Sequence, residues 1–327
     1  MILIAGGAGY IGAHINKQLA VAGYDTVVFD NASTGFQSFV QWGHFVSGDL
    51  RNIADIRRCF DAYPITAVVH TAAASIVPES IQRPDYYYSN NVMGTANLIA
   101  VMQDYGVRDF VFSSTCAVYG DHRDPIAETQ ACQPLTPYGN TKRAIECLLA
   151  DYHAAGLLRY VAFRYFNAAG ADPGGTIGEA HNPETHLIPL CLDAVMGNRP
   201  AVTIFGRDYD TPDGTCIRDY CHVNDIAAAH VLGLKALKTT DISGCYNLGL
   251  GTGHSVLDII QAVEAVTGRS VPVVWGDRRV GDAPQLVAQP GAFAQHTGWT
   301  PTYTDSQSMI QTAWQWHQRE ATMNMVN

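Results

Sequence analysis

The sequence predicts an α/β fold, with a doubly wound parallel sheet and a second, smaller lobe of mixed α/β structure. Three observations support this prediction. Short apolar runs alternate with helical patterns through the first half of the chain. A glycine-rich turn follows the first apolar run, and the alternation stops after Asn167, where Gly, Pro, Asp and Thr become frequent. At 327 residues the chain is long enough for a large core and two lobes.

Strands and helices are expected to alternate up to about residue 167. The expected strands are the apolar runs Ile2–Ala5, Thr26–Phe29, Ala67–His70, Phe110–Ser113 and Tyr160–Tyr165. The expected helices have apolar residues three and four positions apart and span Tyr10–Ala22, Ile53–Ala62, Pro84–Tyr105 and Tyr138–Ala154. In a doubly wound sheet the ligand binds beyond the C-terminal ends of the strands.

The second half of the chain has a less regular pattern and predicts a lobe whose loops cover the ligand cleft. Its expected elements are helices at Leu187–Met196, Asn224–Leu237, Val256–Val266 and Asp305–Glu320, and a strand at Cys245–Leu248. We therefore expect residues 1–167 to form a dinucleotide-binding domain and 168–327 mainly a substrate lobe. Part of 224–250 is expected to return to the first sheet.

The first apolar run leads directly into the pattern Gly6-x-x-Gly9-x-x-Gly12. The first glycine allows a sharp turn, the second lets the backbone approach a pyrophosphate, and the third lets the next helix pack close to the sheet. That helix opens with Tyr10 and Ile11, and its first N–H groups point toward the phosphates. The order of strand, turn and helix favours a dinucleotide site over an ordinary glycine-rich turn.

A carboxylate ends the second apolar run, about 20 residues after the glycines, where a dinucleotide site places one. Asp30 can accept hydrogen bonds from an adenosine ribose and would repel a 2′-phosphate, which favours NAD over NADP. Asp49 follows another apolar segment and is a candidate for contacting the adenine edge, although an isolated Gly-Asp pair is also typical of a turn.

Composition and charge argue against several classes of function. The formal net charge of −10 gives no electrostatic reason to bind nucleic acid. No apolar run approaches the ~18 residues of a membrane span, so we expect a cytoplasmic protein. The eight cysteines contain no C-x-x-C pair, which favours free thiols in a reducing compartment. Since His70, His181, His186 and His222 also lack metal-ligand spacing, no metal site is expected.

A tyrosine and a lysine stand four residues apart after Pro137. Residues at this spacing share a helix face, so Tyr138 and Lys142 can project into one cleft, although a surface pair has the same spacing. A nearby ammonium, together with an oxidised nicotinamide, would favour the phenolate and let Tyr138 act as a base. Thr115 follows a buried strand and is a candidate for sharing the proton, but threonine also caps turns at such positions.

Six motifs occur in order along the chain: GGAGYIG, SSTCAVYG, YGNTK, RYFNAAGA, DGTCIRDY and RRVGD. Together they resemble the UDP-glucose 4-epimerases of the extended short-chain dehydrogenase/reductase superfamily, from Met1 to the last helix. The resemblance implies a Rossmann-type domain and tightly held NAD. It also implies reversible interconversion of UDP-glucose and UDP-galactose at sugar C4 through a 4-keto intermediate.

The resemblance implies a role for each matching residue. Tyr138 would be the base, Lys142 its electrostatic partner and a ribose contact, and Thr115 the hydroxyl that shares the proton. The other expected cofactor contacts are Gly6, Gly9, Tyr10, Ile11, Gly12, Asp30, Asn31, Ser33, Thr34, Asp49, Leu50, Thr71, Ala72, Ala73, Asn90 and Tyr165. The expected substrate contacts are Thr115, Asn167, Leu187, Phe205, Arg218, Arg279, Asp282 and Leu286, of which Leu187 and Phe205 alone would suggest core residues.

Two positions depart from the pattern of the family. Ser75 stands where many relatives carry lysine, which leaves a cofactor contact there open. Leu286 stands where an aromatic residue is associated with excluding N-acetylated sugars and a small residue with admitting them. UDP-GlcNAc, UDP-GalNAc and UDP-pentoses therefore remain alternative substrates.

Two other functions fit the sequence less well. A nucleotide-sugar 4,6-dehydratase typically carries an Asp-Glu pair straight after the threonine, whereas Cys116 and Ala117 follow Thr115 here. A catalytically silent NAD-binding regulator would be expected to lack the pair of Tyr138 and Lys142.

The two helices expected at Pro84–Tyr105 and Tyr138–Ala154 carry apolar residues on more than one face. This surplus predicts a two-fold homodimer through these helices, as the resemblance also implies, unless the second lobe covers them. The residues concerned are Leu98, Ile99, Met102, Leu148, Leu149 and Tyr152.

Overall fold

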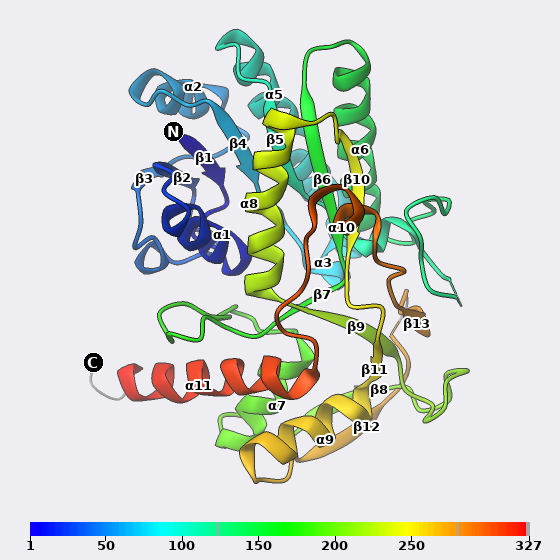
Figure 1. Cartoon of the computed structure of the whole chain (residues 1–327). Coiled ribbons are helices and arrows are strands. Elements are labelled where there is room, and N and C mark those ends of the chain that lie inside the picture. The colour runs from blue at the N-terminus through cyan, green and yellow to red at the C-terminus, as the bar shows by residue number, and fades with distance from the viewer. Residues whose placement is uncertain (123, 280, 325–327) are drawn as a thin grey trace.

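A seven-stranded parallel sheet organises the larger part of the protein, and its strand order is β10-β6-β5-β4-β1-β2-β3. The computed structural model describes residues 1–122, 124–279 and 281–324 (Figure 1). The strands are β1 (Ile2–Ala5), β2 (Thr26–Asp30), β3 (His44–Ser47), β4 (Ala67–His70), β5 (Asp109–Ser113), β6 (Arg159–Tyr165) and β10 (Gly244–Leu248). The prediction of a doubly wound parallel sheet is confirmed.

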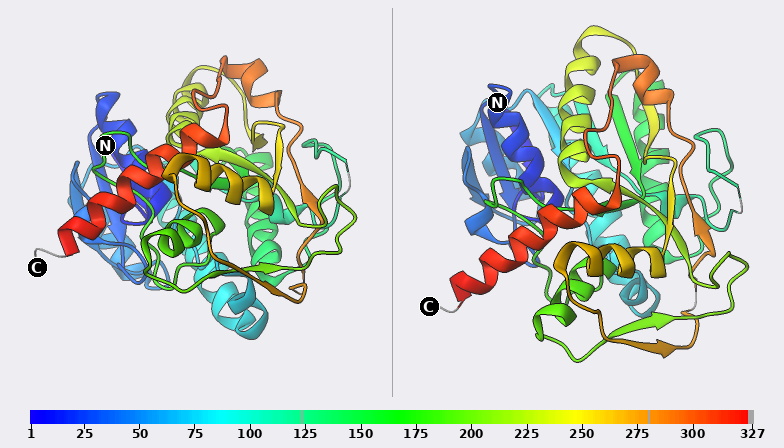
Figure 2. Two further views of the ribbon diagram at one scale, coloured as in Figure 1. Left: turned by 90° about the horizontal axis from the view of Figure 1, so that it is seen from below. Right: turned by 60° about the horizontal axis from the view of Figure 1, so that its bottom comes forward.

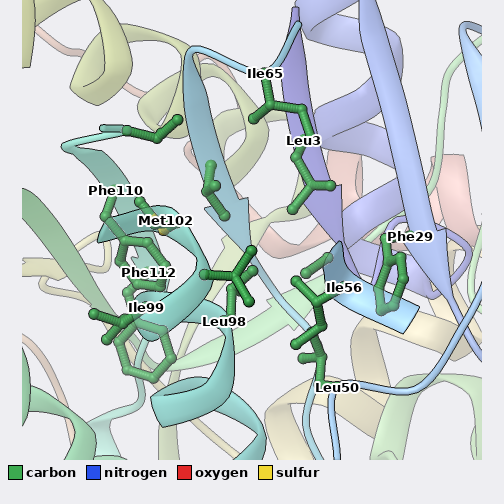
Figure 3. Packing of buried hydrophobic residues seen from close by; sticks show 14 of the residues in the cluster. Leu3, Phe29, Leu50, Ile56, Ile65, Leu98, Ile99, Met102, Phe110 and Phe112 are labelled. Carbon is green, nitrogen blue, oxygen red and sulfur yellow. The ribbon is translucent and has the colours of Figure 1, made fainter. Parts of the chain in front are cut away.

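Helices cover both faces of this sheet because successive strand residues point to opposite sides. Ile2 and Ile4 pack toward α1 and α8, whereas Leu3 and Ala5 pack toward α2, α5 and α6. Figure 3 shows the second of these cores, with Leu3 among the labelled side chains. The helices are α1 (Tyr10–Val21), α8 (Val223–Thr239), α2 (Ile53–Ala62), α5 (Gly94–Asp104) and α6 (Pro137–Ala154).

The single helix expected at Pro84–Tyr105 is wrong in detail. The chain forms α3 (Val77–Gln82) and α4 (Pro84–Tyr87), then a π-helical segment at Tyr88–Met93, and then α5. The side chain of Asn91, inside the π-helical segment, donates to the carbonyl oxygen of Ala74 at 3.0 Å and to Oγ1 of Thr141 at 3.1 Å. The wider turn thus coincides with a buried amide that joins three separate segments, and periodicity does not report such contacts.

The smaller lobe lies beyond the C-terminal ends of the sheet strands (Figures 1 and 2). One small sheet contains β11 (Gly253–Ser255), β9 (Ile217–His222), β13 (Gln285–Leu286) and β7 (Asn167–Ala169), and another pairs β12 (Val273–Gly276) with β8 (Val202–Phe205). The helices of this part are α7 (Leu187–Met196), α9 (Val256–Thr267) and α11 (Ser306–Asn324), whereas α10 (Ala292–Thr297) packs against β10 and α8 of the larger part. The sequence did not predict these strands, since each has only two to six residues between Gly, Pro and Asp.

The chain crosses between the two parts more than once. After β9, α8 packs on the large sheet and β10 adds its last strand, parallel to β6. The segment from Val223 to Leu248 therefore belongs structurally with the first sheet. Within the described part of the chain, no helix is long and apolar enough to cross a membrane.

The apolar surplus on α5 and α6 does not form an exposed face. Leu98, Ile99, Met102 and Leu149 are each 0% exposed and pack in the core between these helices and the sheet. Leu148 and Tyr152, the other two residues of the set, pack against the same core and are only partly exposed. These six residues therefore do not themselves indicate a dimer, because the chain covers most of them.

Candidate active site

The glycine-rich turn between β1 and α1 is tightly packed against the end of β4. A Cβ atom on Gly6, whose φ is +88°, would lie 2.4 Å from the backbone nitrogen of Ala72, and one on Gly12 would lie 2.1 Å from the carbonyl oxygen of Gly6. Oγ1 of Thr71 donates toward the carbonyl oxygens of Ala5 and Gly6, both at 3.0 Å. The nearest atom to a Cβ on Gly9 is 3.5 Å away, so this position stays open to the approach of a pyrophosphate.

The helix that follows is fixed to the second lobe. The hydroxyl of Tyr10 donates to the carbonyl oxygen of Gly170 at 2.6 Å, and Ile11 packs partly buried near the sheet. Gly9 is the N-cap of α1 and has no side chain to occupy the free N–H groups of the first turn. An anion is stabilised at such a helix start by these groups and by the helix dipole.

Asp30 lies where β2 ends, directly beside the glycine turn. Its Oδ2 accepts from the backbone N–H of Ala8 at 3.0 Å and its Oδ1 accepts from that of Ala32 at 2.8 Å. Burial raises the pKa of Asp30, while these backbone donors oppose the shift. The carboxylate is thus oriented by the backbone at the edge where a ribose would lie.

The other residues expected at the adenosine end gather around β2 and β3. Oδ2 of Asp49 accepts from Nδ2 of Asn31 at 3.2 Å, and the same carboxylate pairs with Arg51 at 2.6 Å. The bond to Arg51 lowers the pKa of Asp49 to about 2, so Asp49 is ionised but already partnered. Of the remaining residues, Ser33 donates its N–H to Asn31, Thr34 lines a narrow recess with Gly9 and Tyr10, and Leu50 is buried beneath α5.

The segment after β4 lies against the same turn. The backbone N–H of Ala72 donates to the carbonyl oxygen of Ala5 at 2.9 Å, and Ala73 follows partly buried. Asn90 donates to Oδ1 of Asn91 at 3.1 Å. Asn91 fixes this segment to α6, but one asparagine among polar neighbours gives no distinctive pattern in the sequence. Ser75 is exposed.

Tyr138 and Thr115 meet although they lie 23 residues apart in the sequence. The hydroxyl of Thr115 lies close enough to the phenol of Tyr138, in the first turn of α6, to lower its pKa. Oγ1 of Thr115 also accepts from the backbone N–H of Ala117 at 3.1 Å, which caps the 3₁₀ turn at Cys116–Val118. The two roles considered for this threonine, capping and contact with the base, therefore occur together.

Burial governs the acidity of the two groups on α6. Lys142 is 2% exposed and its Nζ donates to the carbonyl oxygen of Ser113 at 2.7 Å, and burial lowers its pKa to about 7. Burial, and then the neighbouring Tyr165, raise the pKa of Tyr138 well above its usual value, although the nearby hydroxyl of Thr115 opposes them. Lys142, expected to lower this pKa, is not among the main influences on it. A cationic group beside the phenol is required for Tyr138 to act as a base near neutral pH.

A buried ion-pair network holds α6 against β5 and β6. Glu146 accepts two bonds from Arg164, 2.8 Å to Nε and 2.7 Å to NH2, and one from the hydroxyl of Ser114 at 2.6 Å. NH1 of Arg164 also donates to the hydroxyl of Tyr119, which donates to Asn247 at 2.8 Å. No sequence pattern indicates this network, because its members come from four separate segments. It positions both the Thr115 loop and the helix that carries Tyr138.

Five of the expected substrate residues gather on the second lobe. Asp282 lies 2.9 Å from Nε of Arg279 and 3.8 Å from NH2 of Arg218. The guanidinium of Arg279 lies over the ring of Phe205, 4.8 Å from its centre. Leu286 pairs with Arg218 along β13 and β9, and its side chain packs against the cluster that contains Cys116 and Phe166. Two arginines and one carboxylate thus lie near the loop that carries Thr115.

The two remaining substrate residues belong to other elements. Asn167 begins β7 and pairs with Tyr220, two residues along β9 from Arg218. Leu187 begins α7 and packs partly buried against the core of the lobe. Tyr165, expected on the cofactor side, contacts Ser113, and burial raises the pKa of Tyr165 to about 12.

The spacing of the histidines in the sequence indicated no metal site, but the fold brings two of them beside two glutamates. Glu179, His181, Glu184 and His186 each place one ligand atom within 4.8 Å of the others. Burial lowers the pKa of His181, but the carboxylates of Glu179 and Glu184 outweigh this effect and raise it to about 9. The spacing Glu-x-His-x-x-Glu-x-His was visible in the sequence, but it only becomes a cluster through the fold of the loop.

Known proteins resemble this chain over nearly its full length. Residues 2–249 match the NAD dependent epimerase/dehydratase family. A UDP-glucose 4-epimerase of Rhizobium leguminosarum bv. trifolii is 47% identical over 317 residues, which cover 97% of this chain and 97% of that protein. The crystal structure of UDP-glucose 4-epimerase from Brucella ovis in complex with NAD is 48% identical, with a TM-score of 0.91 and coverage of 96% of this chain and 97% of that one.

A more distant relative has the same fold. The crystal structure of UDP-glucose 4-epimerase from Bifidobacterium longum in complex with NAD+ and UDP has a TM-score of 0.93 at 34% identity, and covers 98% of both chains. The chain therefore belongs to the NAD dependent epimerase/dehydratase family, and within it to the UDP-glucose 4-epimerases.

Proposed function

We propose that this protein interconverts UDP-glucose and UDP-galactose by inverting the configuration at sugar C4. The observation that carries the proposal is the contact between the phenol of Tyr138 and the hydroxyl of Thr115, one helical turn from Lys142. Family membership fits these residues to a reaction in which a base acts on the 4-hydroxyl of the sugar and an oxidised nicotinamide acts on the carbon that carries it. Bound NAD, held by the residues around the glycine turn, would supply the reversible hydride transfer at C4 that the inversion requires.

The residues around the glycine turn fit NAD. The open approach at Gly9 and the free N–H groups of α1 suit a pyrophosphate, and the oriented carboxylate of Asp30 suits two ribose hydroxyls. A 2′-phosphate would meet the negative charge of Asp30, which supports NAD over NADP. The proposed cofactor domain is residues 1–167, joined by the returning segment 223–248.

Tyr138, Thr115 and Lys142 each have a separate role in the proposed proton transfer. Tyr138 takes the proton from the 4-hydroxyl of the sugar, and Thr115, beside the phenol, is placed to hydrogen-bond both hydroxyls. Nζ of Lys142 donates to the carbonyl oxygen of Ser113, at the end of β5 and just before the loop that carries Thr115. Lys142 contributes positive charge on the cofactor side. Because Lys142 is buried and Tyr138 is partly buried, few water molecules compete for the proton.

The second lobe is the proposed binding site of the UDP group. Arg218 and Arg279 present two guanidinium groups to a diphosphate, and Asp282, which already pairs with both, can accept hydrogen bonds from the uridine ribose. Phe205, under Arg279, and Leu187, at the start of α7, offer apolar surface, and Asn167 offers an amide beside β9.

The site lacks the acid and the base that a dehydratase would need. Cys116 and Ala117 occupy the positions of the carboxylates that water elimination requires. Burial raises the pKa of Cys116 to about 12, so this thiol stays protonated at neutral pH and does not replace a carboxylate.

The purified protein is expected to form UDP-galactose from UDP-glucose without added cofactor, because the hydride returns to the sugar in every turnover. Denaturing the same sample should release about one NAD per chain if the site holds its cofactor tightly, as measured by enzymatic cycling. Stoichiometric NADP would contradict the role of Asp30. NAD-loaded protein that fails to convert UDP-glucose would contradict the function.

The range of UDP-sugars that the enzyme accepts is expected to depend on Leu286. Its branched apolar side chain offers no hydrogen bond to an acetamide, and a buried unpaired amide costs about 1–3 kcal/mol, or roughly ten- to hundredfold in kcat/KM. We expect UDP-glucose and UDP-galactose to be the main substrates. Leu286→Tyr should abolish the slow turnover of UDP-GlcNAc and spare the turnover of UDP-glucose. Leu286→Ser should raise the turnover of UDP-GlcNAc.

The matched control for this position is Leu157→Ser, which changes an exposed leucine in the turn after α6 and should alter neither substrate. Equal kcat/KM for UDP-GlcNAc and UDP-glucose in the parent protein would contradict the assignment of Leu286.

We also propose a homodimer and a cytoplasmic location. Tyr88 and Met93, at the ends of the π-helical segment beside α6, are 44% and 58% exposed and offer apolar surface to a second copy. Light scattering at micromolar concentration would distinguish a dimer from a monomer of 35.4 kDa.

The proposed cytoplasmic location agrees with the state of the cysteines. The eight cysteines are free, which is consistent with a reducing compartment.

A further inference from the structure

Four ligating side chains that the proposed reaction does not use converge in the segment between β7 and α7. Nδ1 of His186 lies 2.8 Å from Oε1 of Glu179 and 2.8 Å from Oε1 of Glu184. Nδ1 of His181 lies 3.2 Å from Oε1 of Glu179 and 3.6 Å from Oε2 of Glu184. Both imidazoles therefore direct the same ring nitrogen at both carboxylates.

These spacings match the size of a tetrahedral metal site. Zinc bound to nitrogen and oxygen at ~2.1 Å places its ligands about 3.4 Å from one another, and the four ligand atoms here lie within 4.8 Å. Small changes in side-chain torsions would bring them to equal distances from one centre. Two imidazoles with two carboxylates form a donor set of intermediate softness, which suits Zn²⁺ better than Mg²⁺ or Ca²⁺.

A second feature concerns the geometry at one nitrogen. Nδ1 of His181 is buried and faces two carboxylates, 3.2 Å from Oε1 of Glu179, but without the alignment of a regular hydrogen bond to either. Buried polar atoms are nearly always satisfied, and an exception calls for an explanation. A metal ion between His181 and the two glutamates would supply the partner of this nitrogen.

We propose that Glu179, His181, Glu184 and His186 bind one divalent transition-metal ion of the Zn²⁺ type. Four protein ligands fill a tetrahedral shell and leave no open position, so the ion is structural rather than catalytic. A pocket of about 290 Å³, lined also by Phe36, Pro189 and Asp193, lies beside the cluster and gives the ion access from solvent.

The position of the cluster indicates what the ion would stabilise. The ring of His181 lies 6.1 Å from that of Tyr10, in the first turn of α1, and Leu187 directly follows His186. The indole of Trp316 on α11 donates to the carbonyl oxygen of Glu179 at 3.0 Å. The start of the same segment is already fixed by the ion pair of Lys17 and Asp172 at 2.5 Å. The ion would fix the end of a segment that connects the proposed cofactor and UDP sites.

The test uses the purified full-length protein with its cofactor retained, dialysed against a chelator and then titrated with Zn²⁺ in competition with a chromophoric chelator. We expect one Zn²⁺ per chain and a higher Tm with Zn²⁺, and no such change with Mg²⁺. His186→Gln and His181→Gln should each weaken Zn²⁺ binding at least about 100-fold, since even outer-shell partners of a metal contribute 10–100-fold. His44→Gln, an exposed histidine of β3 outside the cluster, should leave binding unchanged.

NAD content and epimerase turnover, measured in the same samples, report whether each variant is folded. Parent protein that carries NAD but binds no Zn²⁺ at micromolar concentration would overturn the proposal, and the four side chains would then form an ion-pair network only. Zinc binding that persists undiminished in both folded histidine variants would also overturn it. Neither result would depend on whether UDP-glucose is the substrate.

Discussion

Turnover of UDP-glucose is expected to fall at least ~100-fold when Tyr138 is replaced by Phe, which is the scale of one lost general base. The phenyl ring keeps the shape of the side chain, so the pocket beside Thr115 stays filled. Only the oxygen that takes the proton from the 4-hydroxyl is lost. Binding of NAD and of UDP-sugar should therefore persist, and the loss should appear in kcat rather than in KM.

Tyr152→Phe is the matched control, because Tyr152 lies on the same helix, α6, and outside the proposed site. Its turnover should equal that of the parent protein. Steady-state kinetics, with cofactor content measured on each sample, test the prediction. Near-normal turnover of a folded, NAD-loaded Tyr138→Phe protein would exclude Tyr138 as the base.

Replacing Arg164 by Met is expected to lower the free energy of unfolding by about 3–5 kcal/mol. Arg164 is 4% exposed and supplies two of the hydrogen bonds of Glu146, which is itself buried. Methionine fills most of the volume but leaves the carboxylate without its main countercharge. A buried charge without a partner costs far more than the net contribution of the intact pair.

The same carboxylate offers a matched control. Arg143 also pairs with Glu146, at 3.1 Å, but its side chain is 41% exposed. Arg143→Met should lower the free energy of unfolding by no more than about 1 kcal/mol, as for other exposed ion pairs. The double variant Arg164→Met/Glu146→Leu should recover much of the loss, because it removes the unpaired charge. Urea unfolding of the NAD-loaded proteins measures all three, and equal stability of Arg164→Met and Arg143→Met would contradict the argument.

The order and type of the main elements could be predicted from the sequence. The strands at Ile2–Ala5 and Ala67–His70 have the predicted bounds, because a buried parallel strand is a continuous apolar run between turn residues. The placement of Tyr138 in the first turn of a helix also agrees with the prediction, since Pro137 and the capping Thr136 mark its start. Where a local pattern is enough to define a structure, the sequence was sufficient.

Patterns of burial were less well predicted. Leu98 and Ile99 were expected to face a second subunit, yet both are fully buried within the chain. A helix that packs both on a sheet and on neighbouring helices is apolar over much of its surface, and so is a helix at an interface. Periodicity does not distinguish these two cases, because it reports that a face is covered and not what covers it.

The sequence by itself determined the parallel sheet, the glycine turn, the carboxylate that ends β2, and the spacing of Tyr138 and Lys142. Only the tertiary structure decided that Thr115 contacts Tyr138, that Arg164 pairs with Glu146, and that two histidines share two glutamates. The physical reason is the range of the interactions. Turns, caps and helix faces depend on residues a few positions apart, whereas pKa values, buried ion pairs and ligand clusters depend on side chains that only the folded chain brings together.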